Sequence, residues 1–274
     1  MPAIDDLRDL LDHQRRAIES SEPGVRDGAD PESLHRFRVA TRRSRALIRA
    51  SRPLVRDQLA SLDRELRWLG GVSGPVRDLD VLLDHLGGML DELGEDRAGA
   101  ESIVAELEKE RAVQRTILVE ALDTDRFRLL LDRFDEALPT LRVMDAGVSL
   151  VAIAQREYER LRAGYDDLGS HASDDELHAV RIKAKHARYA AELAALGHGE
   201  ELTGLAHSLR SIQDLIGAHQ DAVVAEERVR ELATDASRIA AGRIIEQERS
   251  RKRQARDDLP LAWKRVERAA EGAF

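Results

Sequence analysis

Hydrophobic residues recur every three or four positions along most of the chain, and only rarely every second position. This spacing is typical of helices with one buried face, because 3.6 residues make one turn. Examples are the pair Leu118 and Leu122, and then the run Phe127, Leu130, Leu131 and Phe134. We therefore predict an all-α fold. The expected helices cover residues 3–20, 32–51, 54–70, 76–91, 98–122, 125–138, 145–167, 175–196, 200–215, 219–234, 237–256 and 260–271.

Glycine and proline residues separate these periodic segments, as expected for residues that interrupt helices. The predicted breaks are Pro23-Gly24, Pro53, Gly70-Gly71, Gly74-Pro75, Gly87-Gly88, Pro139, Gly169 and Gly197. Three polar pairs have the chemistry of helix starts, because Asp, Ser and Thr side chains accept hydrogen bonds from first-turn amides. These pairs are Asp30-Pro31, Thr124-Asp125 and Ser173-Asp174.

The chain repeats itself with an offset of 143 residues, and no gap is needed between positions 34 and 81. The matched residues include Leu34, His35, Arg38, Arg45, Gly74 and Asp78, which return as Leu177, His178, Arg181, Arg188, Gly217 and Asp221. We expect one domain over residues 1–274, made of two homologous halves, about 1–142 and 143–274. Each half is predicted to be an antiparallel helical bundle, with the halves related by approximate two-fold symmetry.

The repeat contains a basic stripe on one helix face. At 100° per residue, the members of the first stripe span about 80° and about three turns. The first stripe consists of His35, Arg38, Arg42 and Arg45, extended by Arg49, and the second of His178, Arg181, Lys185 and Arg188. Arg43 and His186 lie beside the stripes, whereas Arg67 and Arg210 fall on the next helix and are further candidates for anion binding.

Charge is segregated along the chain. The 43 Lys and Arg residues against 52 Asp and Glu give a net charge of −9, which by itself argues against a polyanionic partner. However, Ser33–Arg56 contains eight Arg and no acid, and Leu177–Ala191 contains four Lys or Arg and no acid. These stretches carry +12, which leaves −21 for the remainder. Arg suits phosphate because its planar guanidinium donates two parallel hydrogen bonds, and a nearby His adds charge on acidification.

Four segments resemble the ordered motifs of the CHAD family, the conserved-histidine α-helical domains. Residues 34–45 and 177–189 are similar to its paired signatures, and residues 77–81 and 215–221 to its second and fourth motifs. The resemblance implies a stand-alone member with two bundles around a basic central cavity or pore that binds inorganic polyphosphate. Carried over to this chain, the polyphosphate-binding set is His35, Arg38, Arg42, Arg45, His178, Arg181, Lys185 and Arg188. The departures are Ser44, Ala187 and His186.

A di-metal bundle enzyme is a lower alternative, because Glu32-x-x-His35 and Asp175-x-x-His178 place a carboxylate and an imidazole on one face. The cations that follow each His make such a site electrostatically poor for a dication. We therefore expect no metal and no cofactor. Asp78 and Asp221 are expected to cap a helix or to orient an arginine.

Catalysis is not expected, because the sequence contains no Gly-rich phosphate loop and no evident nucleophile–base pair. Nucleic acid or another polyanion is the alternative ligand, since basic helices attract any phosphate backbone. Aromatic residues make up only 3% of the chain, so the stacking surfaces that bind single strands are scarce. A thin polyanion such as polyphosphate is therefore favoured, and nucleic acid is disfavoured.

Cysteine is absent, which excludes disulfides and thiolate chemistry. No apolar run reaches the ~20 residues of a membrane span, and no secretory signal follows the first Met. We expect a soluble cytoplasmic protein without a membrane partner, for which polyphosphate granules are a candidate attachment site.

Overall fold

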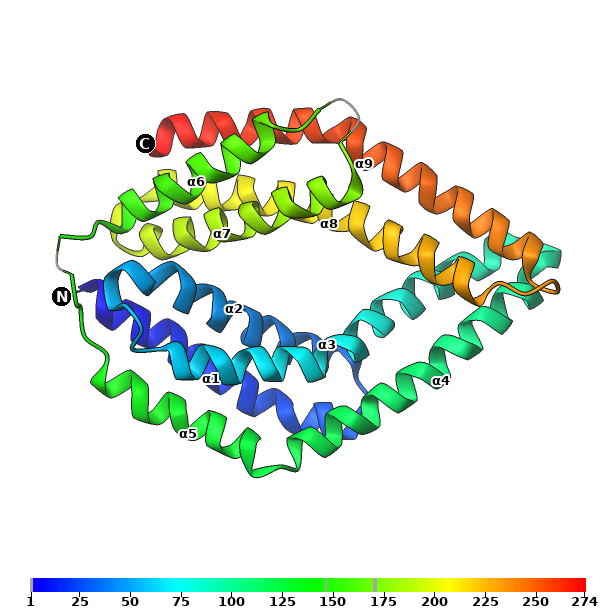
Figure 1. Ribbon diagram of the computed structural model, residues 1–274, viewed down its shortest axis with the longest axis horizontal. Coiled ribbons are helices and arrows are strands. Elements are labelled where there is room, and N and C mark those ends of the chain that lie inside the picture. Colours follow the sequence, from blue (N-terminus) through cyan, green and yellow to red (C-terminus); the bar gives the residue numbers. More distant parts are fainter. Residues whose placement is uncertain (1, 146, 170–171) are drawn as a thin grey trace. The chain divides into compact units, whose positions relative to one another are not determined.

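A computed structural model describes residues 2–145, 147–169 and 172–274, and all the regular secondary structure of these residues is helical (Figure 1). This confirms the all-α prediction. The α-helices are α1 (Pro2–Asp27), α2 (Pro31–Val55), α3 (Ala60–Met89), α4 (Arg97–Leu122), α5 (Asp125–Thr140), α6 (Leu150–Asp166), α7 (Asp174–His198), α8 (Glu200–Leu232) and α9 (Arg238–Ala273), and the 3-10 helix η1 (Leu90–Asp96) connects α3 to α4.

The predicted helix starts are confirmed. Asp30 precedes α2, and its carboxylate accepts a hydrogen bond of 2.9 Å from the Glu32 amide. At α7, Ser173 Oγ accepts from the Glu176 amide at 3.2 Å, while Glu176 Oε2 accepts from the Ser173 amide at 2.6 Å. This reciprocal capping box satisfies amides that have no partner within the helix. It also lowers the pKa of Glu176. The starts of both basic helices are therefore fixed by local sequence.

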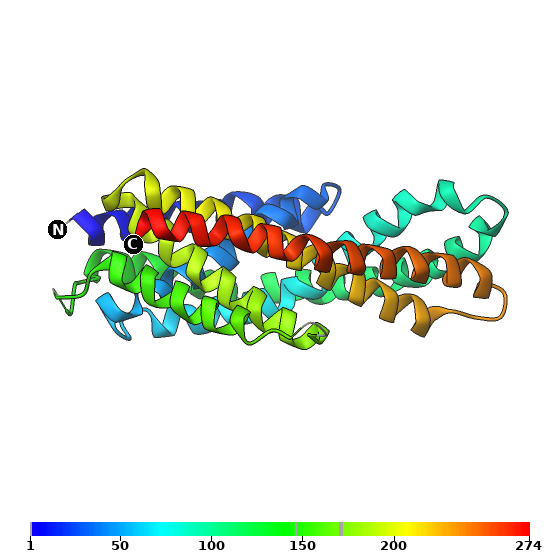
Figure 2. The same ribbon diagram turned by 90° about the horizontal axis from the view of Figure 1, so that it is seen from above.

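Most of the predicted breaks were wrong. The residues that lie inside helices are Pro23-Gly24, Pro53, Gly70-Gly71, Gly74-Pro75, Gly87-Gly88, Pro139 and Gly197. In addition, α3, α8 and α9 each join two of the expected segments, and α9 is drawn as one long helix in red and orange in Figure 2. Proline removes an amide donor and glycine weakens a helix, yet most helix stability in proteins comes from packing of an apolar face.

In α3 that face continues across the glycines and proline, through Leu66, Leu69, Ser73 and Val76, all buried. Helix α6 begins at Leu150 instead of 145, and Ala146 lies outside the described residues.

Contacts divide the chain into two compact units. The first unit comprises Met1–Asp78, Val113–Glu157 and Tyr189–Thr203, and the second comprises Leu79–Ala112, Tyr158–Arg188 and Gly204–Phe274. These units are a division by contact, whereas the predicted halves are a division by sequence repeat. The halves therefore stay a prediction.

The first unit has a core formed between α1, α2 and α5. Helix α1 packs along α2 and buries Leu7, Leu11 and Ile18. Phe37 of α2 is fully buried and lies 6.2 Å, between ring centroids, from Phe127 of α5. This packing orients α2 so that its polar face, which carries the basic residues, points away from the core.

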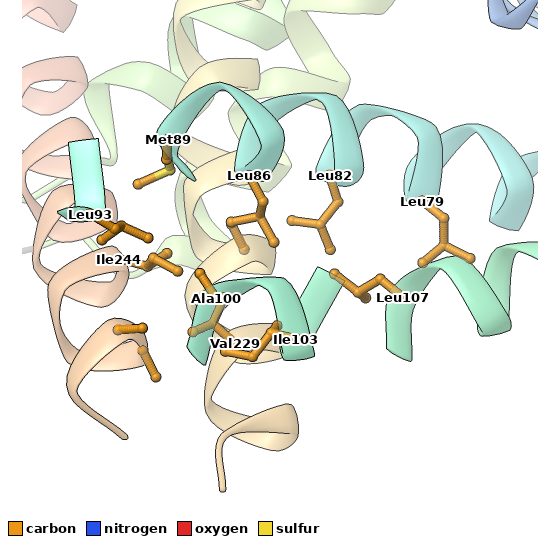
Figure 3. Packing of buried hydrophobic residues seen from close by; sticks show 13 residues of the cluster. Leu79, Leu82, Leu86, Met89, Leu93, Ala100, Ile103, Leu107, Val229 and Ile244 are labelled. Atoms are coloured by element: carbon orange, nitrogen blue, oxygen red, sulfur yellow. The ribbon is translucent and has the colours of Figure 1, made fainter. Parts of the chain in front are cut away.

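The second unit is built around a four-helix cluster of the later part of α3, the early part of α4, the later part of α8 and the early part of α9. Figure 3 shows its apolar core, in which Leu86, Ile103, Leu107 and Val229 are nearly or completely buried. Each such side chain contributes roughly 1.5–3 kcal/mol relative to an exposed one.

An ion-pair belt, defined by the contacts that follow, links each neighbouring pair of these four helices. The ion pairs are Arg111 (α4) with Asp80 (α3), Arg228 (α8) with Glu110 (α4), and Arg249 and Lys252 (α9) with Glu226 (α8). A hydrogen bond between His85 (α3) and Glu248 (α9) completes the belt, and Arg251 on α9 neutralises Glu248. Asp80, Glu226 and Glu248 are buried, so their ion pairs form away from water. An unpaired buried carboxylate is costly, and the belt neutralises each of these acids.

Candidate anion-binding site

Helix α2 places Arg38 deep against α3. Its Nη1 donates a hydrogen bond of 3.2 Å to the Gly70 carbonyl oxygen, and its Nη2 lies 3.6 Å from Asp78 Oδ1. Asp78 lies in the middle of α3 instead of at a helix start, so of the two predicted roles it takes the orienting one. Burial lowers the pKa of Arg38, and Arg42 and Arg77 lower it further against the opposing effect of Asp78. An arginine nevertheless stays charged at neutral pH.

Two further arginines of α2 are oriented by acids. Arg45 Nε donates to Asp63 Oδ1 at 3.2 Å, and Arg52 Nη2 lies 2.8 Å from Asp57 Oδ1. Asp63 also accepts from Arg67 Nη2 at 3.2 Å, one turn along α3. Arg67, a further candidate for anion binding, is therefore paired within its own helix.

Arg42 and Arg49 differ from these paired arginines. Both are exposed on α2, and neither forms an ion pair with any residue that the structure describes. Like charges on one helix face destabilise the helix by roughly 0.2–0.5 kcal/mol per i,i+4 pair. An exposed row of cations without carboxylates is the electrostatic arrangement that a bound anion would neutralise.

His35 lies at the start of this basic face and is half-buried. Burial lowers its pKa, and the neighbouring Arg77, Arg42 and Arg36 lower it further, while Glu32 raises it. Arg77 comes from α3 and is a further candidate that the stripe analysis missed. Its position one repeat later is Gln220, so the repeat does not single it out. Its place in the 77–81 motif was the available signal.

Helix α7 carries the second set of basic residues, within the second unit. Arg181 Nε and His178 Nδ1 are buried and have no hydrogen-bond partner within the described parts of the chain. Arg188 is buried, and its Nε donates to Gln213 Oε1 at 3.0 Å. Lys185 is half-buried. The four residues thus differ in access, and Arg188 is the least accessible.

The same glycine–arginine contact occurs on both basic helices. A Cβ at Gly74 would lie 3.0 Å from Arg38 Nη1, and a Cβ at Gly217 would lie 3.4 Å from Arg181 Nε. Both members of the second pair follow the first by 143 residues. The absence of a side chain at each glycine leaves room for an arginine to lie across the next helix.

The remaining candidates have mixed surroundings. Arg43 Nη2 lies 3.5 Å from Glu192 Oε2 within the first unit. His186 is half-buried on α7, and Arg210 is exposed on α8. The first basic face lies in the first unit and the second in the second unit, so the expected common cavity stays a prediction.

A cluster around His219 holds the start of α7. Arg256 Nε donates to His219 Nε2 at 3.1 Å, while its Nη1 and Nη2 donate to the Ala172 carbonyl and to Asp174 Oδ1, each at 2.6 Å. Burial and Arg256 lower the pKa of His219 against the effect of Asp174. A neutral imidazole with a bare Nε2 is the form that can accept this bond.

Neither His35 nor His178 belongs to a metal-ligand cluster, since no group of three or more His, Asp or Glu side chains within residues 2–145, 147–169 and 172–274 is placed to hold a metal ion. The cations around His35 disfavour a dication there. No helix in the described part of the chain has the length and apolarity needed to cross a membrane.

Comparison with solved structures gives the same helical fold. The crystal structure of the CHAD domain from the plant Ricinus communis aligns with a TM-score of 0.79 and 25% sequence identity, covering 96% of this chain and 91% of that chain. PptA from Streptomyces chartreusis aligns with a TM-score of 0.77 and 20% identity, covering 96% and 100%. At that identity the second match indicates a shared fold alone.

Two uncharacterized proteins of Mycobacterium tuberculosis, from strains CDC 1551 and H37Rv, are each 29% identical to this chain over 262 residues. The alignment covers 88% of this chain and 49% of each relative, so the chain spans about half the length of these curated relatives. The family model of the CHAD domain matches residues 9–230. With its four motifs in order and this match over most of its length, the chain belongs to the CHAD family.

Proposed function

We propose that the protein binds inorganic polyphosphate, without catalysis, through the basic faces of α2 and α7. The observation that carries this proposal is the exposed pair Arg42 and Arg49, which have no carboxylate partner among the described residues. The family resemblance adds the ligand class, since it implies polyphosphate binding at these positions. The residues proposed to bind are His35, Arg38, Arg42, Arg45, Arg49, His178, Arg181, Lys185 and Arg188, with Arg77 added.

The absence of catalysis is part of the proposal and has a physical basis. A phosphoryl-transfer site usually holds Mg²⁺ on carboxylates beside the cations that bind phosphate. Here the carboxylates beside the α2 face are committed to arginines, with Asp63 on Arg45 and Asp78 near Arg38. These acids orient cations and are poorly placed to hold a metal ion.

Calorimetric titration with long-chain polyphosphate at 50 and 200 mM salt tests this function. Binding should weaken steeply with salt, because each neutralised phosphate releases counterions and contributes about 0.7 to the slope for a flexible chain. Single-stranded DNA of equal charge is the comparison ligand, and it should bind more weakly. No binding of polyphosphate at 50 mM salt would refute the function. Equal affinity for both ligands would reduce it to general polyanion binding.

The affinity for polyphosphate should rise as the pH falls through the pKa of His35. That pKa is lowered in the free protein by burial and by Arg77, Arg42 and Arg36, while Glu32 opposes them. At pH 8 the imidazole is neutral, and protonation at lower pH adds one cation to the face. A bound polyanion stabilises the protonated form, so binding should take up protons.

Titrations at pH 6 and pH 8 in two buffers of different ionisation enthalpy measure this proton uptake. His35→Gln should remove part of the pH dependence, whereas His13→Gln, an exposed histidine of α1, should not. An unchanged pH profile in His35→Gln would show that another group titrates.

Association with polyphosphate granules is proposed as a consequence of the protein's affinity for long polyphosphate chains.

A further inference from the structure

Apart from Arg36 and Arg43, the basic residues of α2 and Arg56 after it form two rows with different surroundings. The paired row consists of Arg38, Arg45 and Arg52, whose acids are Asp78, Asp63 and Asp57. The accessible row consists of His35, Arg42, Arg49 and Arg56. No member of the accessible row forms an ion pair with the residues described by the structure, and its three arginines are exposed. The acids of α3, together with Asp57 in the turn between α2 and α3, therefore pair with one row and leave the other without a carboxylate partner.

His35, Arg42 and Arg49 are seven residues apart within α2, which keeps them on one face with a drift of only about 20° per seven residues. Arg56 follows Arg49 by seven residues and comes directly after the last residue of α2. At 1.5 Å per residue, His35 and Arg56 are about 32 Å apart along the axis. An extended polyanion lying along this face would therefore meet a cation every two turns.

Arg56 occupies a backbone conformation that suits glycine. It follows the last residue of α2 with φ 54° and ψ −134°, and its amide donates to the Arg52 carbonyl at 2.7 Å. Among the described residues it is the one non-glycine with positive φ. An L-residue with a Cβ is strained in this region, whereas glycine adopts it readily. The backbone conformation at position 56 therefore favours glycine over arginine.

The repeat supplies a direct comparison at this position. The residue 143 positions later is Gly199, which directly follows α7 and has φ 100°. The residue equivalent to Arg49 is Glu192, which lies near Arg43. The row on α7 thus ends at Lys185, and there the strained position has the residue that its backbone favours. On α2 the row continues through Arg49 to Arg56.

We propose that the anion-binding face of α2 extends along the accessible row to Arg56, past the end of the helix, and binds a longer stretch of polyanion than the face of α7. This inference rests on the proposed function. The alternative is that Arg56 only stabilises the carboxyl end of α2, where cations interact favourably with the helix dipole. The two explanations predict opposite changes in stability when Arg56 becomes glycine.

The experiment compares wild type, Arg56→Gly, Arg56→Lys and the exposed control Arg265→Gln by titration with long-chain polyphosphate between 50 and 200 mM salt. Arg56→Gly should lower affinity about two- to fivefold, as expected for one exposed ionic contact. It should also make the salt slope shallower by about 0.7. Its unfolding midpoint in urea should equal or exceed that of wild type. Arg56→Lys and Arg265→Gln should stay within about twofold of wild type.

Three results would overturn the extension to Arg56 while leaving the proposed function intact. The first is wild-type affinity and salt slope in Arg56→Gly. The second is a loss in Arg265→Gln as large as that in Arg56→Gly. The third is a lower urea midpoint in Arg56→Gly together with weaker binding, which would make Arg56 a structural residue. Failure of wild type to bind polyphosphate at 50 mM salt would instead refute the proposed function.

Discussion

Replacing Arg42 and Arg49 together by glutamine is expected to weaken polyphosphate binding by about tenfold at low salt. Each exposed ionic contact is worth up to ~1 kcal/mol, and about 1.4 kcal/mol corresponds to a factor of ten in affinity. The loss of two phosphate contacts should also reduce the slope of log affinity against log salt by about 1.4. The fold should be retained, because both side chains are exposed and unpaired within the described structure.

The matched control for this variant is Arg265→Gln combined with Arg268→Gln. These arginines are exposed on α9, so the control removes the same charge from a helix surface outside the proposed face. In calorimetric titrations, the control should keep nearly the wild-type affinity for polyphosphate, so the affinities of the two double variants should differ by most of the tenfold effect. Equal losses in the two variants would mean that binding follows net charge, and the assignment to α2 would then be wrong.

Glu226→Gln is expected to destabilise the second unit by about 3 kcal/mol, because the substitution removes the buried carboxylate that neutralises three neighbouring cations. Glu226 is 4% exposed and meets Arg230, Arg249 and Lys252. Burial by itself would raise its pKa, but hydrogen bonds from Lys252, Arg249 and Arg230 prevail and lower it to about 2.

The sign of the pH dependence follows from this lowered pKa. The ionised form stabilises the fold above the unfolded-state pKa of 4.5, and the stabilisation is lost as the pH falls through about 2. Its contribution should be about 3 kcal/mol at pH 7 and about 1.4 kcal/mol at pH 3. Glu226→Gln should therefore differ less from wild type at pH 3 than at pH 7.

Urea unfolding at both pH values measures this difference when it is followed by the fluorescence of Trp263 in a Trp68→Phe background, because Trp68 lies in the first unit. Glu106→Gln is the control, because Glu106 forms an exposed i,i+3 pair with Lys109. Its effect should stay below about 1 kcal/mol. An equal cost for the two substitutions at pH 7 would show that the buried cluster contributes no more than a surface pair.

Two basic segments of this chain look alike in sequence and differ in their surroundings. Residues 249–256 contain five Lys or Arg and no acid, much as residues 33–56 do. Yet Arg249 and Lys252 meet Glu226, Arg251 meets Glu248, and Arg256 meets Asp174. Periodicity predicts which face a cation occupies, but an acid on another helix decides whether that cation is paired. Sequence alone therefore predicts the stripe on residues 35–49 but does not show which of its cations are paired.

The prediction of helix boundaries failed for a related reason. Local rules treated Gly70-Gly71 and Gly74-Pro75 as breaks, and they predict correctly where nothing packs around the segment. In α3, buried Leu69 and Val76 lie on either side of these residues and keep the helix continuous. The same glycine that weakens the helix at position 74 leaves room for Arg38, a contact between helices that local propensity does not reveal.

The ion-pair belt of the second unit also has a consequence for alignment of its helices. Apolar side chains such as Leu86 and Leu107 can repack after a shift, because dispersion and burial have little directional preference. A slip of one helix by a single turn, about 5.4 Å, would separate buried Asp80 from Arg111, or buried Glu226 from Arg249 and Lys252. The belt therefore favours one axial alignment of the four helices over alignments in which a helix is shifted by one turn.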